Sequence, residues 1–200
     1  MINNRIPPAS LVRDALKKSD KFSITALGSS MTPVIWHRSI VTVRWSDPGE
    51  IKAGDIIVKG IGFNYIIHRV IGIRENMHEN GEKYLHFITK GDFLAKPDPF
   101  YCADEYIGKV CRIENRFISF DPNSVSGLIR ALCVFFSKAG CLADRAFGFL
   151  YKFIYKNRIL QLIYRTVFSF PVLVINTGVL IYYYLRRRLW KNSRESWGAY

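Results

Sequence analysis

Apolar and polar residues alternate along the middle of the chain, in short runs rich in β-branched and aromatic side chains. These runs are "SIVTVRW", "DIIVKG", "NYIIHRVIGI", "YLHFITK", "YIGKVCRI" and "RFISF". Between them stand "SDPGEIKAGD", "RENMHENGEK" and "GDFLAKPDPF", which are rich in Gly, Pro, Asn and Asp. Such a pattern predicts antiparallel strands joined by turns. We therefore expect one compact β domain over residues 22–121.

The pattern before residue 22 is helical instead. In "PPASLVRDALKKSDKF" the apolar residues Leu11, Val12, Ala15 and Leu16 recur at helical spacing and predict one short helix. Residues 1–21 are therefore expected to form a helical lead-in, and they lack the long apolar core of a secretory signal peptide.

Residues 122–200 form a third region, which we expect to be helical. The stretch "LIRALCVFFSKAGCLADRAFGFLYKFIYKNRILQLIYRT" combines apolar residues at helical spacing with Arg and Lys on the remaining face. It fits either amphipathic helices on a membrane surface or a helical layer packed on the β domain.

An uncharged run, residues 167–185, follows and ends directly before Arg186, Arg187 and Arg188. At the helical rise this run would reach about 28 Å, close to the ~30 Å hydrocarbon core of a bilayer. We predict a transmembrane or deeply inserted helix here, which places the protein at a membrane. A buried helix or an oligomer contact is the alternative.

Composition narrows the choice of partners only partly. The 200 residues carry a formal net charge of +13, which suits nucleic acid, an anionic membrane surface or solubility alone. Apolar residues make up 49% of the chain, which excludes a wholly disordered protein. No C-x-x-C or H-x-x-x-H spacing occurs, so we expect no metal site and no cofactor. We expect free thiols at Cys102, Cys111, Cys133 and Cys141, although the spacing leaves an oxidised pair open.

The stretch "ALGSSMTPVI" raises the possibility of serine chemistry, through Ser29 or Ser30. A serine nucleophile needs a base within hydrogen-bond reach and donors for the oxyanion that forms on attack. His68 in "NYIIHRVIGI" is the candidate base, and Asp92 and Asp98 in "ITKGDFLAKPDPF" are candidate acids that could orient it. Taken one by one, these residues are better explained as a core or edge histidine and two turn aspartates.

The relevant segments, in chain order, are "GSSMTP", "GDIIVKG", "IIHRVIGI" and "ITKGD", with Asp98 six residues further on. Taken together and in this order, they resemble the boxes of the type I signal peptidase family. The match covers residues 22–112, and the His-Arg-Val box resembles the branch of the endoplasmic-reticulum-type and archaeal-type enzymes. The resemblance implies that Ser30 is the nucleophile, His68 the general base and Asp98 the third member, with Asp92 also required.

The same resemblance implies a mainly antiparallel β fold with a shallow groove. An extended peptide would add to one sheet edge as a strand and would be cleaved after small residues through an acyl-enzyme. In the family, Ser or Thr two residues before the nucleophile helps to form the oxyanion hole, whereas this chain has Gly28. The hole and the substrate contacts would then come from the segment that contains Gly28, Ser29, Met31 and Pro33. The membrane anchor would be C-terminal rather than N-terminal.

The sequence therefore predicts a mainly β protein with a helical C-terminal region, acting as a membrane-associated serine endopeptidase of signal-peptidase type. Its expected partners are a peptide or preprotein substrate and membrane lipid, without nucleic acid. One alternative is an inactive peptidase-like module that binds anionic lipid or nucleic acid through its basic C-terminal half. Another is a repressor-type autopeptidase with a Ser-Lys dyad, for which the segment before Ser30 is too short to hold a DNA-binding domain. The sequence indicates neither the substrate nor the oligomeric state.

Overall fold

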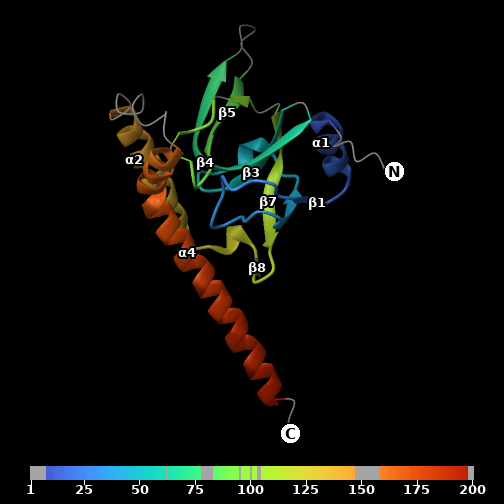
Figure 1. The fold of residues 1–200 in the computed structure, drawn as a ribbon. Coiled ribbons are helices and arrows are strands. Elements are labelled where there is room, and N and C mark those ends of the chain that lie inside the picture. The colour runs from blue at the N-terminus through green and yellow to red at the C-terminus, as the bar shows by residue number, and fades with distance from the viewer. Residues whose placement is uncertain are drawn as a thin grey trace.

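A computed structural model describes residues 8–61, 63–77, 83–94, 96–99, 101–102, 105–146 and 158–197 of the chain. A β domain occupies the centre, with a short helix on one side and two longer C-terminal helices on the other (Figure 1). This arrangement confirms the predicted mainly β fold with a helical C-terminal region.

Within the described residues, the strands form one antiparallel sheet in the order β1-β2-β7-β3-β4-β5-β6, and β8 pairs with β7. Their bounds are Phe22–Thr25 (β1), Ile40–Arg44 (β2), Ile56–Ile61 (β3), Asn64–Met77 (β4), Lys83–Lys90 (β5), Tyr101–Cys102 (β6), Tyr106–Glu114 (β7) and Ser119–Phe120 (β8). Each long apolar run of the sequence coincides with one of these strands, because the runs fit a pleated and half-buried surface.

The helices are α1 (Ala9–Lys18), α2 (Gly127–Ala146) and α4 (Arg158–Trp197), with short 3₁₀ turns η1 (Pro48–Glu50) and η3 (Pro122–Ser124). Helix α1 buries Val12 and Leu16 against the sheet and leaves Leu11 exposed. It approaches β3 so closely that a Cβ on Gly60 would lie 2.1 Å from the Cβ of Ala9. The contact therefore requires glycine at that position.

One face of α4 packs against the β domain. Ser169, Val172, Asn176 and Leu180 recur at helical spacing and are 0%, 0%, 4% and 8% exposed. Leu180 belongs to the main hydrophobic core, and burying a side chain of its size stabilises the fold by about 1.5–3 kcal/mol. For residues 167–185 the sequence left a buried helix open as an alternative to membrane insertion, and this face of α4 is buried.

The segment 167–185, predicted to be transmembrane or deeply inserted, lies within α4. In the described part of the chain, no helix is both long and apolar enough to cross a bilayer. The side chains of Arg186, Arg187 and Arg188 fall outside the described ones. Membrane insertion thus stays a prediction.

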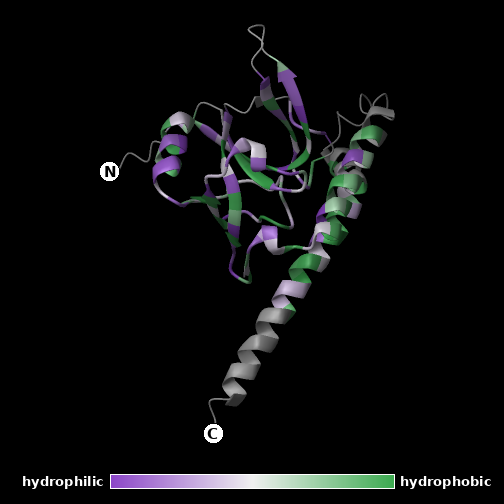
Figure 2. Ribbon diagram, turned by 180° about the vertical axis from the view of Figure 1, so that it is seen from behind, coloured by the Kyte–Doolittle hydropathy of each residue, from purple (hydrophilic) through white to green (hydrophobic). Residues whose placement is uncertain are grey.

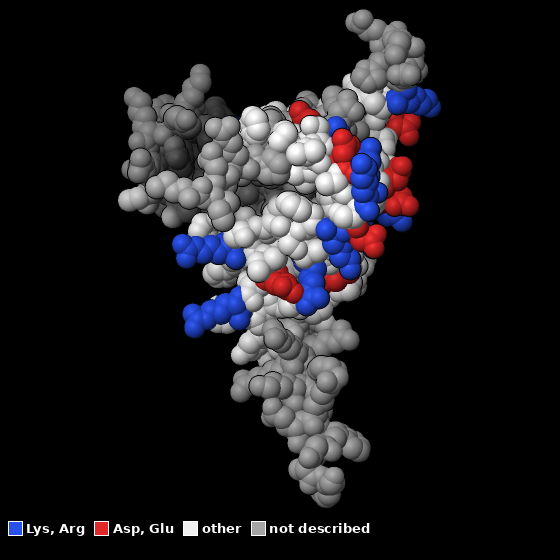
Figure 3. Space-filling model, turned by 90° about the vertical axis from the view of Figure 1, so that its right-hand side faces the viewer, with Lys and Arg blue, Asp and Glu red and all other residues white. Residues whose placement is uncertain are grey.

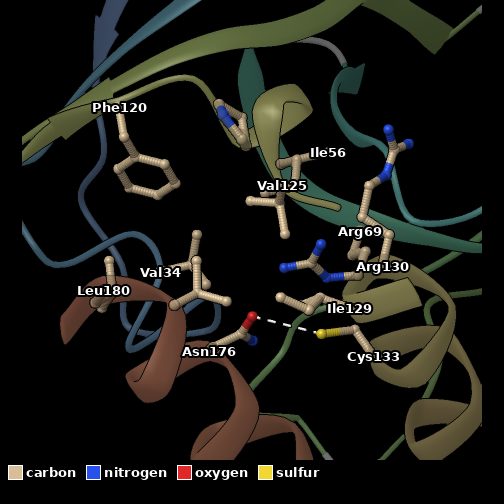
Figure 4. A pocket seen from close by; sticks show the side chains of 12 residues that line it. Val34, Ile56, Arg69, Phe120, Val125, Ile129, Arg130, Cys133, Asn176 and Leu180 are labelled. Atoms are coloured by element: carbon tan, nitrogen blue, oxygen red, sulfur yellow. Dashed lines mark hydrogen bonds between the residues drawn. The ribbon is translucent and has the colours of Figure 1, made fainter. Parts of the chain in front are cut away.

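A small cavity marks where the helices meet the β domain. Figure 4 shows Val34, Ile56 and Phe120 of the β domain facing Ile129 of α2 and Leu180 of α4 around it. Its volume is about 20 Å³, enough for roughly one water molecule. The helices therefore pack directly on the sheet at this seam and leave no space for a larger ligand.

Candidate active site

Ser30, His68 and Asp98 form a continuous chain of hydrogen-bonding groups. Ser30 lies in the turn region between β1 and β2, His68 on β4, and Asp98 in the segment after β5. His68 Nε2 lies 3.0 Å from Ser30 Oγ, and His68 Nδ1 lies 2.6 Å from Asp98 Oδ2. The His68 residue is 6% exposed. The structure thus brings the three predicted catalytic residues together in the order nucleophile, base and acid.

The turn after β5, residues 91–94, holds the Ser30 segment in place. The Phe93 N–H donates to the carbonyl oxygen of Ser30 at 2.8 Å. A Cβ on Gly91 would lie 2.7 Å from that carbonyl oxygen and 3.0 Å from His68 Nε2, so only glycine leaves room for both groups. The Asp98 N–H donates to the Thr89 carbonyl oxygen at 2.8 Å, which ties the backbone at Asp98 to the end of β5.

Asp98 is held as a carboxylate by donors that converge on one oxygen. Oδ2 accepts from Thr89 Oγ1 at 2.6 Å and from Lys59 Nζ at 2.9 Å, in addition to its contact with His68. Burial alone would raise the pKa of Asp98, but the contacts with His68, Thr89 and Lys59 outweigh it and lower that pKa to about 2. At neutral pH a carboxylate in this position can stabilise the cation that forms when His68 accepts a proton.

Asp92, also predicted to be required, belongs to a separate buried ion pair. Arg69 donates to both of its carboxylate oxygens, Nε to Oδ1 at 2.8 Å and Nη2 to Oδ2 at 2.7 Å. Burial would lower the pKa of Arg69, but the adjacent Asp92 carboxylate outweighs it and raises that pKa. Arg69 Nη1 also donates to the Gly54 carbonyl oxygen at 3.1 Å. Asp92 therefore anchors the 91–94 turn to the sheet and lies outside the Ser30–His68–Asp98 chain.

A groove of about 700 Å³ runs past Ser30 and His68. One wall is β1, an edge strand whose described pairing is with β2 alone. The opposite wall is the first part of β4, residues 64–68, which pairs with β3 but lies before the β4–β5 pairing begins at Arg69. Two strand edges therefore border the groove and present main-chain hydrogen-bonding groups to it.

The residues predicted to form the oxyanion hole and the substrate contacts divide into two sets. Gly28 and Met31 line the groove beside Ser30. Pro33 follows a cis peptide bond and instead lines a second hollow with Trp36, while Ser29 is exposed and lines neither. A Cβ on Gly28 would meet no atom within 4 Å, so there is open space at this position.

The structure adds residues to the site that were not singled out from the sequence. Lys59 and Thr89 contact Asp98, while Asn176 Nδ2 on α4 donates to Asp92 Oδ2 at 3.0 Å. The sequence could have indicated Lys59 by its position, because a residue two places after Ile57 lies on the same face of the strand. In the structure Lys59 is 1% exposed. The signal for Asn176 was its place as a strongly polar residue inside an uncharged apolar run.

No three His, Cys, Asp or Glu side chains cluster as a metal site among the described residues. Cys111, Cys133 and Cys141 are free thiols, while the side-chain environment of Cys102 lies outside the described part. Comparisons with protein-family models, curated proteins and solved structures find no match to this chain. The case for a function therefore depends on the geometry of the site.

Proposed function

We propose that this protein is a serine endopeptidase of signal-peptidase type that cleaves extended peptides through an acyl-enzyme. The observation that carries the proposal is the hydrogen-bonded chain of Ser30, His68 and Asp98 at the side of a groove bordered by two strand edges. A nucleophile, a base and an orienting carboxylate in this order form the arrangement that activates a serine.

The reaction follows from the observed contacts. His68 Nε2, 3.0 Å from Ser30 Oγ, accepts the hydroxyl proton as Ser30 attacks the carbonyl carbon of the scissile bond. The imidazolium, balanced by Asp98, then gives that proton to the leaving amine, and an ester remains on Ser30. Water attacks the ester, His68 accepts a proton from it and returns the proton to Ser30 Oγ, and the acid product leaves.

The groove supports an extended peptide as the substrate. Its two walls, β1 and residues 64–68 of β4, could each pair with a substrate strand through main-chain hydrogen bonds. Leu27 and Phe63, which are 74% and 65% exposed, add apolar surface along the groove for substrate side chains. A small residue just before the scissile bond is the preference that the family resemblance suggests.

Cleavage of a peptide whose apolar segment ends in Ala-x-Ala tests this proposal. We expect the parent protein to cleave it and to react with a fluorophosphonate probe, and Ser30→Ala and His68→Ala each to lose both activities. Ser29→Ala is the matched control because its side chain is exposed beside the nucleophile, and it should retain both. Cleavage by Ser30→Ala at the parental rate would contradict the assignment of the nucleophile.

We place the helical region at a membrane surface. Exposed apolar side chains recur at helical spacing on α2 and α4, and Figure 2 shows how apolar residues predominate along the described part of α4. They are Leu128, Leu132, Phe135 and Leu142 on α2 and Ile159, Ile163, Val167, Phe170, Val174 and Ile181 on α4. An exposed face of this extent supports contact with lipid.

Flotation with phosphatidylcholine–phosphatidylglycerol vesicles tests the membrane proposal. The double variant Phe135→Asp/Phe170→Asp should float less than the parent, because each substitution puts a charge on the proposed lipid-facing side. Met77→Asp, at an exposed position on β4, should float like the parent. Equal flotation of all three proteins, or none by the parent, would contradict the proposal.

One observation weighs against the repressor-type autopeptidase considered from the sequence. Lys59, a buried lysine close to the site, is bonded to Asp98 and Thr89, whereas His68 is the base that faces Ser30, so the geometry does not favour a Ser-Lys dyad. On the face that Figure 3 presents, the coloured Lys and Arg side chains lie interspersed with Asp and Glu.

A further inference from the structure

A buried lysine, Lys59, contacts the proposed catalytic carboxylate of Asp98 directly. The Lys59 side chain is 1% exposed and that of Asp98 is 10% exposed. Lys59 Nζ lies 2.9 Å from Asp98 Oδ2 and 2.5 Å from Thr89 Oγ1, and Thr89 Oγ1 in turn donates to Asp98 Oδ2. Lys59, Thr89 and Asp98 thus form a closed ring of contacts that includes Oδ2, the same carboxylate oxygen that contacts His68.

The Lys59 ammonium changes the net charge next to His68, compared with a triad in which the carboxylate has no cation beside it. A lone Asp98 carboxylate would favour the protonated form of the neighbouring His68. With the Lys59 ammonium present, Asp98 and Lys59 together carry no net charge, so this effect is weaker. Burial lowers the pKa of Lys59, while the contact with Asp98 opposes this change and favours the charged ammonium.

We propose that Lys59 is a positioning residue that offsets the charge of Asp98, so that His68 remains able to accept the Ser30 proton at lower pH than Asp98 alone would allow. The catalytic meaning of this inference rests on the proposed peptidase function. Lys59 acts through Asp98, because its ammonium bonds that carboxylate while Ser30 Oγ contacts His68.

Other charged groups lie near Lys59 and Asp98 and contribute to the net charge around His68. Glu105, before β7, acts on Lys59 and favours its charged form. Lys90, at the end of β5, is 1% exposed and interacts with both Asp98 and Asp92. Arg69 and Asp92 form a neutral pair and largely cancel. Lys59 is the cation bonded directly to Asp98, so its removal should have the largest effect on His68.

The pH dependence of kcat/KM provides the first test. Lys59→Met removes the charge while keeping a long apolar side chain, and Thr89→Val removes a hydrogen bond from the same ring without changing any charge. We expect Lys59→Met to move the acid limb of the profile up by about one pH unit, which is roughly a tenfold loss of activity on that limb. Thr89→Val should move it by less than half as much. Equal shifts in both variants, or no shift in Lys59→Met, would overturn the inference.

A measurement on the resting protein separates this inference from the peptidase proposal. The ring signals of His68, identified by their loss in His68→Gln, can be followed by NMR across pH in the parent and in Lys59→Met. The midpoint should rise by about one pH unit in the variant even if no peptide is cleaved. An unchanged midpoint would overturn the role of Lys59 even in an active peptidase. Lys59→Gln provides the same comparison if Lys59→Met does not fold.

Discussion

Asn176, in the middle of α4, donates a hydrogen bond from Nδ2 to Oδ2 of Asp92 over 3.0 Å. The carboxylate that accepts it is 1% exposed and also binds Arg69. Earlier on the same helix, Ser169 Oγ donates to the carbonyl oxygen of Leu94 at 3.3 Å. Helix α4 therefore contacts the 91–94 turn at two points, and that same turn holds the backbone of the proposed nucleophile.

Asn176→Leu should impair the site although Asn176 does not contact the triad. The change removes a donor to a buried carboxylate, and such bonds contribute about 1.5–3 kcal/mol. We expect a lower melting temperature and slower labelling of Ser30 by a fluorophosphonate, with little change in KM. Thr177→Val changes the next residue of α4, whose side chain is exposed, and should match the parent in both melting temperature and labelling rate. Parental labelling by Asn176→Leu would show that the turn keeps its position without this bond.

Gly28→Ser should increase activity. The position lines the groove beside Ser30, a Cβ there would meet no atom within 4 Å, and the family resemblance expects a hydroxyl at this place. A new oxyanion donor can raise the rate by about 10²–10³. The measurement is kcat for the test peptide, and Gly28→Ala serves as the control without a hydroxyl. A rate for Gly28→Ser no higher than that of Gly28→Ala would remove position 28 from the oxyanion hole.

Gly91→Ala should nearly abolish activity. The added Cβ would lie 2.7 Å from the Ser30 carbonyl oxygen and 3.0 Å from His68 Nε2, closer than ordinary contacts allow, so the turn or the nucleophile must shift. We expect a loss of about 10²-fold or more in kcat/KM. Gly127→Ala, where a Cβ meets nothing within 4 Å, should behave like the parent. Near-parental activity of Gly91→Ala would mean that the nucleophile is not confined as described.

Asp98 should stabilise the fold above about pH 4 and lose this effect in acid. Its pKa falls from an ordinary value of 3.8 to about 2 in the folded protein, so the folded state favours the carboxylate. The stabilisation is roughly 2 kcal/mol, is complete well above pH 4, and disappears as the pH falls to 2. Thermal unfolding of the parent and Asp98→Asn should therefore differ most at neutral pH and converge near pH 2. A gap that does not depend on pH would contradict the ionised state of Asp98.

The sequence predicted the sheet and the grouping of Ser30, His68 and Asp98 because both depend on local signals. Alternating apolar residues indicate strands whatever the later topology, and the boxes around Ser30, His68 and Asp98 carry their own residue patterns. The partners of these groups were not predictable in the same way. The Lys59–Asp98 and Asn176–Asp92 contacts join residues 39 and 84 positions apart, and these depend on strand order and on the face of α4 that turns inward.

The seam in Figure 4 has a consequence for how the chain can be divided. A protein ending at Asp121 would contain every residue of the proposed triad and the complete sheet. It would nevertheless expose Val34 and Ile56 to water, and it would leave the Arg69–Asp92 pair open to solvent on the side that Asn176 now covers. The helical half thus supports the proposed site, and recombination or gene fission at residue 121 would yield a sheet that keeps Ser30, His68 and Asp98 but lacks the contacts that hold the 91–94 turn.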